Sequence, residues 1–146
     1  MRFALTLVTL AGLAMLTSCA RRAEDRPAMV PSIVGVWMVE MPAGALPCNG
    51  ESSVAYAADG TIVMRSGAQL LRGTYRATLR ADGRFDVVVK LSEHNGEPNC
   101  QGFSSAFVIE HTPPIFTVER KGSELRTCLS SDICFRAALR HELPRA

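Results

Sequence analysis

The sequence predicts an all-β domain, a small antiparallel meander β-barrel of about eight to nine strands with two disulfides. Apolar and polar residues alternate with period two in many short runs from Ile33 onward, a pattern typical of strands with one buried face. Turn residues separate these runs at short intervals. A chain of 146 residues with 47% hydrophobic residues has material for one domain with a real core.

The clearest element is a hairpin over residues 70–92. Its first strand has apolar or small residues at the odd positions of 71–79 and arginines and threonines between them. Asp82 and Gly83 supply a turn, and alternation resumes over 85–91. We therefore expect two paired strands with one buried and one solvated face.

The other expected strands are shorter. A second hairpin turns at Asp59 and Gly60, which join a strand through Val54 and Tyr56 to one through Ile62 and Met64. Further strands are expected over 33–41, 103–109, 115–120, 124–129 and 133–140, and no segment predicts a helix. Because strands joined mainly by hairpins can remove their exposed edges by closing, we prefer a barrel to a sandwich.

The amino terminus has the pattern of an export signal. Arg2 is followed by about fourteen apolar residues, fewer than the roughly twenty of a spanning helix. The stretch ends in Leu16-Thr17-Ser18-Cys19, which resembles the lipobox of bacterial lipoproteins. The resemblance implies that 1–18 is a signal peptide and that Cys19 is acylated, for example with palmitate. The alternative is an ordinary secretory signal in which Cys19 is incidental.

Residues 19–32 are expected to form a lipidated flexible tether, because they mix charges and prolines without a hydrophobic period. The lipoprotein resemblance implies a protein anchored in the cell envelope. Ala20 after the cysteine implies the outer membrane, facing the periplasm or the cell surface. The barrel domain is then expected over 33–141, with a tail over 142–146.

A second resemblance covers the barrel. Gly35-Val36-Trp37 opens the first strand and arginines occur in the last, which is similar to the pattern of lipocalins and other calycins. The resemblance implies that Trp37 plugs the closed end of the barrel. It also implies that Arg136 or Arg140 packs across the indole, where a guanidinium stacks favourably. The alternative is that Trp37 is an ordinary aromatic residue of the core.

The cysteines predict two bridges. Of the five cysteines, four remain when Cys19 is assigned to the lipid. An even number of cysteines in an oxidising compartment is expected to form disulfides. Three pairings are formally open. Cys128 and Cys134 lie on adjacent expected strands with their side chains on the same face, so they can form a disulfide. Cys48 and Cys100 are then left to pair with each other. The spacings do not match zinc sites, so no metal is predicted.

The sequence lacks the common catalytic and nucleotide-binding motifs, including Gly-x-Ser-x-Gly, His-Glu-x-x-His and the phosphate loop. We therefore expect a protein that is not an enzyme and that needs no cofactor. A formal charge of +2 does not indicate binding to nucleic acid.

Four basic residues are expected on the solvent face of the 70–92 hairpin: Arg72, Arg76, Arg80 and Lys90. Neighbouring cations repel unless an anion is near, so this stripe is a candidate contact for the phosphates of lipopolysaccharide or phospholipid. The alternative is a solvated face that discourages edge pairing.

These expectations lead to one functional hypothesis and two alternatives. The hypothesis is a non-enzymatic, outer-membrane-anchored lipoprotein whose lipocalin-like barrel binds a small apolar ligand or an envelope partner. The alternatives are a lipidated inhibitor of a secreted or host hydrolase, either a protease or lysozyme, and a structural or assembly accessory of the outer membrane. A cavity of about a few hundred cubic ångströms would favour ligand binding, whereas a solid core would favour protein contact through loops.

Overall fold

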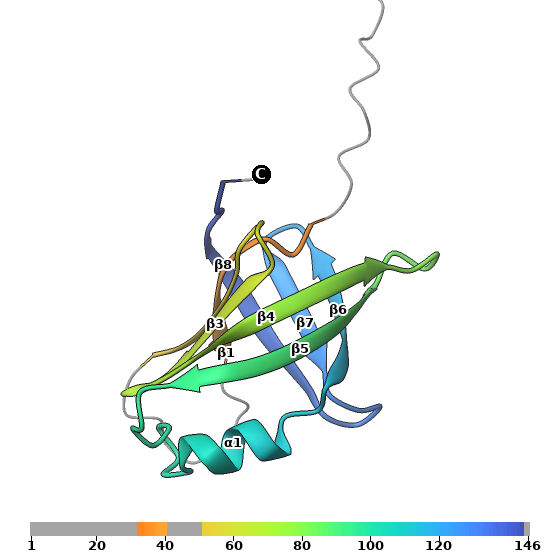
Figure 1. Ribbon diagram of the computed structural model, residues 1–146. Coiled ribbons are helices and arrows are strands. Elements are labelled where there is room, and N and C mark those ends of the chain that lie inside the picture. The colour runs from red at the N-terminus through yellow and green to blue at the C-terminus, as the bar shows by residue number, and fades with distance from the viewer. Residues whose placement is uncertain (1–31, 41–50, 145–146) are drawn as a thin grey trace, which may run out of the picture. The chain divides into compact units, whose positions relative to one another are not determined.

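The structure is a computed structural model that describes residues 32–40 and 51–144. In order, its elements are β1 (Gly35–Glu40), β2 (Ser52–Tyr56), β3 (Thr61–Ser66), β4 (Gln69–Leu79), β5 (Phe85–His94), α1 (Ser105–His111), β6 (Ile115–Lys121), β7 (Glu124–Cys128) and β8 (Cys134–His141). Each strand pairs antiparallel with the next, and β8 pairs with β1 to close the barrel (Figure 1). The predicted all-β meander barrel is confirmed, with eight strands in the described residues.

Two tight hairpins, β2–β3 and β4–β5, have the turns that the sequence predicted. In each turn an aspartate carboxylate accepts a hydrogen bond from the backbone N–H two residues later, at 2.9 Å for Asp59 and 3.1 Å for Asp82. The glycine that directly follows each aspartate has a positive φ, 85° at Gly60 and 82° at Gly83. Glycine adopts this conformation without a steric penalty, so the Asp-Gly pairs favour both turns.

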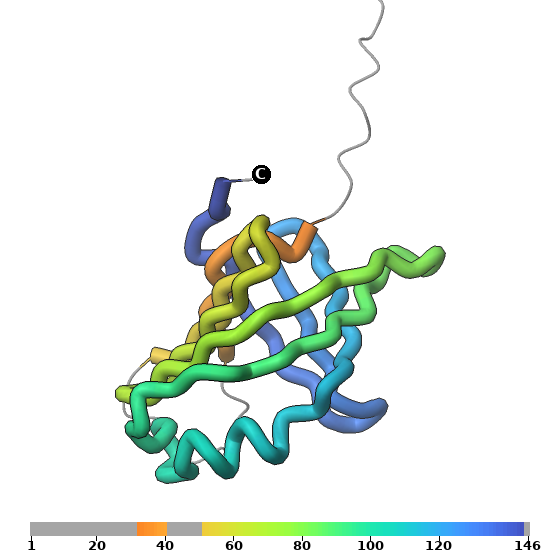
Figure 2. The backbone as a smooth tube through the Cα atoms, viewed as in Figure 1, coloured from red at the N-terminus to blue at the C-terminus, as the bar shows by residue number. Residues whose placement is uncertain are grey.

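The pairing of β4 with β5 shifts register between Arg72 and Gly73. A Cβ atom at Gly73 would lie 2.1 Å from the carbonyl oxygen of Lys90, so only glycine fits. Such a bulge bends a long strand and increases its twist, which helps a sheet to close. The two strands run side by side across the barrel in Figure 2.

The strand predicted over 103–109 is wrong, because this segment contains a loop end and the start of α1. The Ser104 side chain caps the helix by accepting a hydrogen bond from the Phe107 N–H at 3.2 Å. The helix ends at His111, two residues before Pro113, and a proline disfavours helical conformation in the residue before it. α1 lies across one end of the barrel (Figures 1 and 2).

The core is formed by the inward-facing side chains, which occupy alternate positions along each of the eight strands. Its largest fully buried side chains are Trp37, Tyr56, Ile62, Leu71, Leu125, Val87 and Val118. Among the described residues, no helix has both the length and the apolar character needed to cross a bilayer.

Candidate functional site

Trp37 fills the end of the barrel at which β1 begins. Its side chain has 0% exposure, and the indole Nε1–H donates a hydrogen bond to the Ile33 carbonyl at 2.8 Å. The guanidinium carbon of Arg120 lies 5.1 Å from the centroid of the indole. We call this arrangement of Ile33, Trp37 and Arg120 the closed end, because its groups are packed and hydrogen-bonded.

The basic residue over the indole comes from β6, whereas the resemblance implied Arg136 or Arg140 of β8. That expectation is wrong for a geometric reason. Arg136 and Arg140 are exposed and occupy positions of β8 that alternate with the buried Ala137. Arg120 instead has the same parity as the buried Val118, so β6 directs it toward the barrel interior.

Hydrogen bonds hold the guanidinium of Arg120 in place. Nη1 donates to the Ser32 carbonyl, Nε donates to the Gly122 carbonyl at 3.0 Å, and Nη2 donates to the Glu142 carboxylate at 3.0 Å. The side chain is only 14% exposed. Each nitrogen of the Arg120 guanidinium thus donates one hydrogen bond within the protein, and these bonds hold the residue over Trp37.

Gly35 gives the closed end the space that it needs. Its φ is 150°, a conformation that residues with a side chain rarely adopt. A Cβ at this position would lie 2.9 Å from the Leu139 side chain and 3.4 Å from the indole nitrogen of Trp37. The glycine of the Gly-Val-Trp motif therefore lets the chain pass directly beside the indole.

The other end of the barrel, beside α1, contains a pocket of about 380 Å³, which we call the open-end pocket. Among the described residues, its apolar lining comprises Val39, Val54, Met64, Leu71, Phe107, Val108, Phe116, Leu129, Phe135 and Ala137. Its volume is within the range of about 300–1,000 Å³ that is typical of small-molecule sites. The barrel thus has one filled end and one hollow end.

α1 forms part of the pocket mouth and is anchored at its first residue. The Gln69 amide donates to the Ser105 hydroxyl at 3.2 Å, and that hydroxyl donates to the Glu97 carbonyl at 2.9 Å. Phe107 and His111 line the pocket, and their rings stack with centroids 4.0 Å apart. Since Phe107 is 43% exposed, the helix presents an aromatic surface to solvent at the mouth.

Tyr56 lies at the opposite end of the pocket lining. It is the last residue of β2, pairs with Gly35 of β1, and is only 1% exposed. Its ring packs edge-on against Tyr75, with centroids 4.9 Å apart. Burial, with a smaller contribution from Tyr75, raises the pKa of Tyr56 well above its ordinary value. The Tyr56 hydroxyl therefore remains a protonated hydrogen-bond donor at neutral pH.

One of the two predicted disulfides is confirmed. Cys128 and Cys134 are directly opposite partners on β7 and β8, and their sulfurs are 2.07 Å apart. Cys100 lines the open-end pocket. Its predicted partner, Cys48, lies outside the described residues, so the pairing of Cys48 with Cys100 stays a prediction.

Cys19 and the predicted signal peptide also lie outside the described residues, as does the predicted tether up to residue 31. Acylation of Cys19 therefore stays a prediction.

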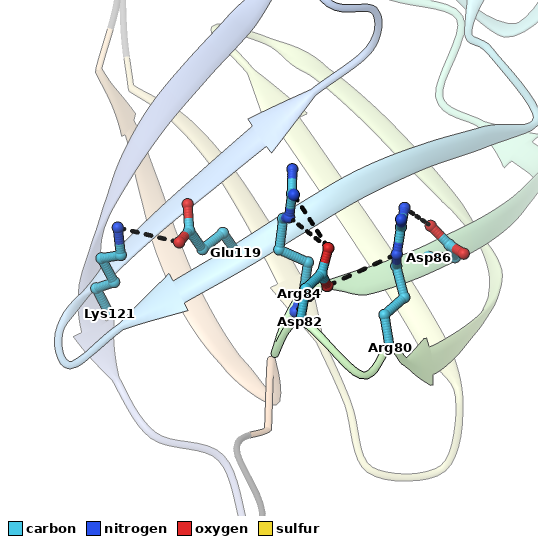
Figure 3. A network of polar contacts seen from close by, with 6 residues as sticks. All are labelled: Arg80, Asp82, Arg84, Asp86, Glu119 and Lys121. Carbon is cyan, nitrogen blue, oxygen red and sulfur yellow. Dashed lines mark hydrogen bonds and ion pairs between the residues drawn. The ribbon is translucent and has the colours of Figure 1, made fainter.

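The four residues of the predicted basic stripe are exposed on β4, the following turn and β5: Arg72, Arg76, Arg80 and Lys90. Arg80 lies 3.6 Å from the Asp82 carboxylate and 3.4 Å from the Asp86 carboxylate (Figure 3). A backbone hydrogen bond from Arg84 lowers the pKa of Asp82, so this partner is ionised at neutral pH. The charge of Arg80 is therefore matched by neighbouring carboxylates, whereas Arg72, Arg76 and Lys90 form no ion pair with another described residue.

Two important residues were missed by the sequence reasoning. Arg120 was treated as the end of a strand, although its spacing of two from Val118 could have placed it inside. Tyr56 was assigned to a strand, but nothing in the sequence pattern distinguishes a tyrosine beside a pocket from one in a solid core. In the described residues, no three His, Cys, Asp or Glu side chains gather as a metal site.

Comparisons of the chain with protein-family models, curated proteins and solved structures find no match. The geometry of the barrel therefore supplies the basis for assigning a function. Its two ends differ in a way that matters chemically, since one is plugged by Trp37 and the other has an apolar pocket.

Proposed function

We propose that this chain is a lipid-anchored protein of the bacterial cell envelope whose barrel binds a small apolar molecule in the open-end pocket. The proposed role is binding and not catalysis. The observation that carries it is the pocket of about 380 Å³ with largely apolar walls. Burying apolar ligand surface there would provide most of the binding free energy.

A cavity inside a domain usually lowers its stability, because the atoms that line it lose packing contacts. Side chains such as Trp37, Ile62 and Val118 are fully buried in other parts of the interior. The hollow region at the mouth is thus a local feature of a barrel that is otherwise well packed. A hollow mouth is where other small barrels hold their ligands.

The volume of the pocket also favours ligand binding over the two alternatives. A hydrolase inhibitor or an assembly accessory would act through its loops and would need no pocket in the barrel. Such a protein would gain stability from a solid core. The open-end pocket is therefore better explained by a molecule that enters the barrel.

The proposed anchor depends on the lipobox-like sequence that ends at Cys19. Each buried methylene of an acyl chain contributes about 0.8 kcal/mol, so two or more chains hold a protein stably on a bilayer. The outer membrane is the proposed location, because Ala20 follows the cysteine. The tether would then connect the anchor to the barrel.

The Cys19→Ser substitution tests the anchor. We expect this variant to incorporate no radiolabelled palmitate and to accumulate as an uncleaved precursor in the inner membrane. The matched control is Ser18→Ala, which keeps a small residue before the cut and should be acylated normally. Normal processing and outer-membrane recovery of Cys19→Ser would contradict the anchor.

A pair of neighbouring alanines tests the pocket. Ala137 is 6% exposed and lines it, whereas Ala138 on the same strand faces solvent. The full chain in lipid nanodiscs would be titrated with the neutral fluorescent probe N-phenyl-1-naphthylamine, with empty nanodiscs as the blank. We expect saturable binding by the wild type and by Ala138→Leu. Ala137→Leu should weaken binding about tenfold or more, because its added carbons occupy ligand space.

Absence of saturable binding by the wild type would contradict the proposed function. Equal binding by the two leucine variants would place the probe outside the pocket and would also contradict it.

A further inference from the structure

We infer that the ligand of the open-end pocket carries a neutral hydrogen-bond acceptor, such as a ketone or ester carbonyl, at the end that enters the barrel first. This inference rests on the proposed function and names the chemical class of its ligand. The group that selects the acceptor is the hydroxyl of Tyr56.

The Tyr56 hydroxyl has unused donor capacity. Tyr56 is 1% exposed, and its hydroxyl makes no hydrogen bond with a described residue. No buried side-chain oxygen or nitrogen of the described residues is both fully enclosed and without a partner. The hydroxyl of Tyr56 must therefore keep contact with open space. Tyr56 lines the open-end pocket, and we place the open contact of its hydroxyl there.

The neighbouring tyrosine shows the contrast. The Tyr75 hydroxyl donates to the Ala57 carbonyl at 2.8 Å, so its donor is already used. The two rings are in contact, with centroids 4.9 Å apart. Only Tyr56 of this pair is left with a hydroxyl that a ligand could engage.

An unpaired donor surrounded by apolar side chains is a strong basis for selectivity. A ligand that accepts a hydrogen bond from this hydroxyl satisfies the donor, whereas a ligand without an acceptor displaces any water there and leaves the hydroxyl unpaired. Sites built in this way discriminate against analogues that lack the polar group. The pocket should therefore prefer a carbonyl compound to a hydrocarbon of the same shape.

The acceptor is inferred to be neutral because no described residue supplies an available cation beside Tyr56. The basic side chains of the pocket lining belong to its mouth: Arg65 pairs with Ser53 near the start of β2, and Arg136 pairs with Glu40 at the end of β1. The Arg120 guanidinium lies over Trp37, and each of its nitrogens donates a hydrogen bond to a carbonyl or carboxylate of the protein. A carboxylate beside Tyr56 would lose hydration without gaining a countercharge, and this is unfavourable.

The volume of the pocket limits the size of the ligand. At about 380 Å³ the pocket is near the lower limit of small-molecule sites. This suits a molecule with one or two rings, or a short chain, and not a whole diacyl lipid.

Three naphthalenes of nearly equal shape test the inference. They are 2-acetylnaphthalene, which has a neutral acceptor, 2-isopropylnaphthalene, which has none, and 2-naphthoate, which is anionic. Their binding to the full chain in lipid nanodiscs would be measured by calorimetry, with empty nanodiscs subtracted. For the wild type we expect the acetyl compound to bind about three- to tenfold more tightly than the isopropyl compound, as for one net hydrogen bond. The naphthoate should bind at least about tenfold more weakly than the acetyl compound.

The variants Tyr56→Phe and Tyr75→Phe form a matched pair, because each loses one hydroxyl and keeps its ring. In Tyr56→Phe the acetyl and isopropyl compounds should bind within about twofold of each other, as the donor is gone. In Tyr75→Phe the wild-type preference should persist. Circular dichroism and the emission of Trp37 would verify that both variants fold.

The outcomes separate this inference from the proposed function. If no naphthalene binds the wild type, the proposed function fails and the inference fails with it. If all three bind the wild type with similar affinity, the pocket binds apolar molecules but the inference is overturned. A carbonyl preference that survives in Tyr56→Phe would also overturn it. The wild-type series alone decides the question if Tyr56→Phe does not fold.

Discussion

The two ends of this barrel are built from the same eight strands but are packed differently. At the closed end Trp37 has no exposed surface, its N–H is bonded to Ile33, and Arg120 covers its ring. At the open end the strands surround a pocket of about 380 Å³, and Phe107 remains 43% exposed. The difference indicates that the closed end stabilises the fold through packing, whereas the open end is less tightly packed and contains a pocket.

The residues that face inward at the two ends differ accordingly. The closed end has the largest side chain of the domain and a glycine beside it, which allows close packing. The open end has the small or polar residues Ser52, Ser66 and Gln69 among its lining. It is also braced by a disulfide, since Leu129, next to Cys128, lines the pocket.

The largest expected effect is at the closed end. Truncation of a buried tryptophan typically costs about 3–5 kcal/mol, a large part of the stability of a small domain. We expect Trp37→Ala to be largely unfolded or degraded, as measured by circular dichroism and chemical denaturation. The folded wild type should show blue-shifted emission that is hard to quench, since Trp37 is its only tryptophan. Red-shifted, readily quenched emission would show that the closed end is not a packed plug.

The disulfides test the bracing of the open end. Replacement of both Cys128 and Cys134 by serine should lower the free energy of unfolding by about 2 kcal/mol, because their loop is short. Replacement of Cys48 and Cys100 should cost more, about 4 kcal/mol, if they form the predicted long-range bridge. Urea denaturation measures both losses, and non-reducing peptide mapping identifies the pairs. A larger loss from the short bridge would contradict the predicted order.

Arg120 tests whether the cover over Trp37 contributes to stability. We expect Arg120→Ala to cost about 1–2 kcal/mol, through lost hydrogen bonds and a lost cation–π contact. Arg120→Met keeps much of the apolar stem and separates packing from charge. The exposed controls Arg136→Ala and Arg140→Ala should change stability by less than about 0.5 kcal/mol. Equal losses from all three alanine variants would show that Arg120 has no special position.

The smallest expected effect on stability is at the mouth. Phe107 and Phe103 are exposed to 43% and 44%, and their rings stack with each other, but only Phe107 lines the pocket. Each alanine variant should lose about 1 kcal/mol or less. Only Phe107→Ala should weaken binding of N-phenyl-1-naphthylamine in the titration described above. Similar binding losses from both variants would mean that the stack as a whole, and not the pocket wall, contacts the probe.

Much of the barrel could be predicted from the sequence because strand alternation is a local signal. The residues of the 70–92 hairpin alternate in the sequence as they do in β4 and β5, and Asp82 and Gly83 form its turn. Cys128 and Cys134 were placed opposite each other by counting along adjacent strands. In each case a pattern within about twenty residues determines the structure.

The helix was missed because its signals are short. α1 has only seven residues, and its apolar positions were interpreted as strand alternation. The better signal was the spacing of four between Phe103, Phe107 and His111, together with Ser104 as a cap. A helix of two turns provides too few positions for hydrophobic periodicity to separate it from a strand.

The pocket could not be predicted because it depends on distant parts of the chain. Val39, Met64 and Ala137 meet only after the barrel closes. The same is true of Arg120 and Trp37, which are brought together from β6 and β1. The volume of a pocket and the contacts across a barrel depend on strand register and curvature. These two properties cannot be predicted from any single segment of the sequence.

Two methionines allow the most direct test of the claim that the open end binds a small apolar molecule. Met64 lines the pocket, whereas Met38 lies on β1 between the inward-facing Trp37 and Val39, with its sulfur 3.9 Å from the Arg140 guanidinium. Methyl NMR of the full chain in lipid nanodiscs, labelled at methionine, would follow a titration with N-phenyl-1-naphthylamine. Assignments would come from Met64→Leu and Met38→Leu. We predict a saturable shift of the Met64 methyl resonance with Met38 unchanged. An unchanged Met64 resonance, or equal shifts of both, would contradict binding inside the barrel.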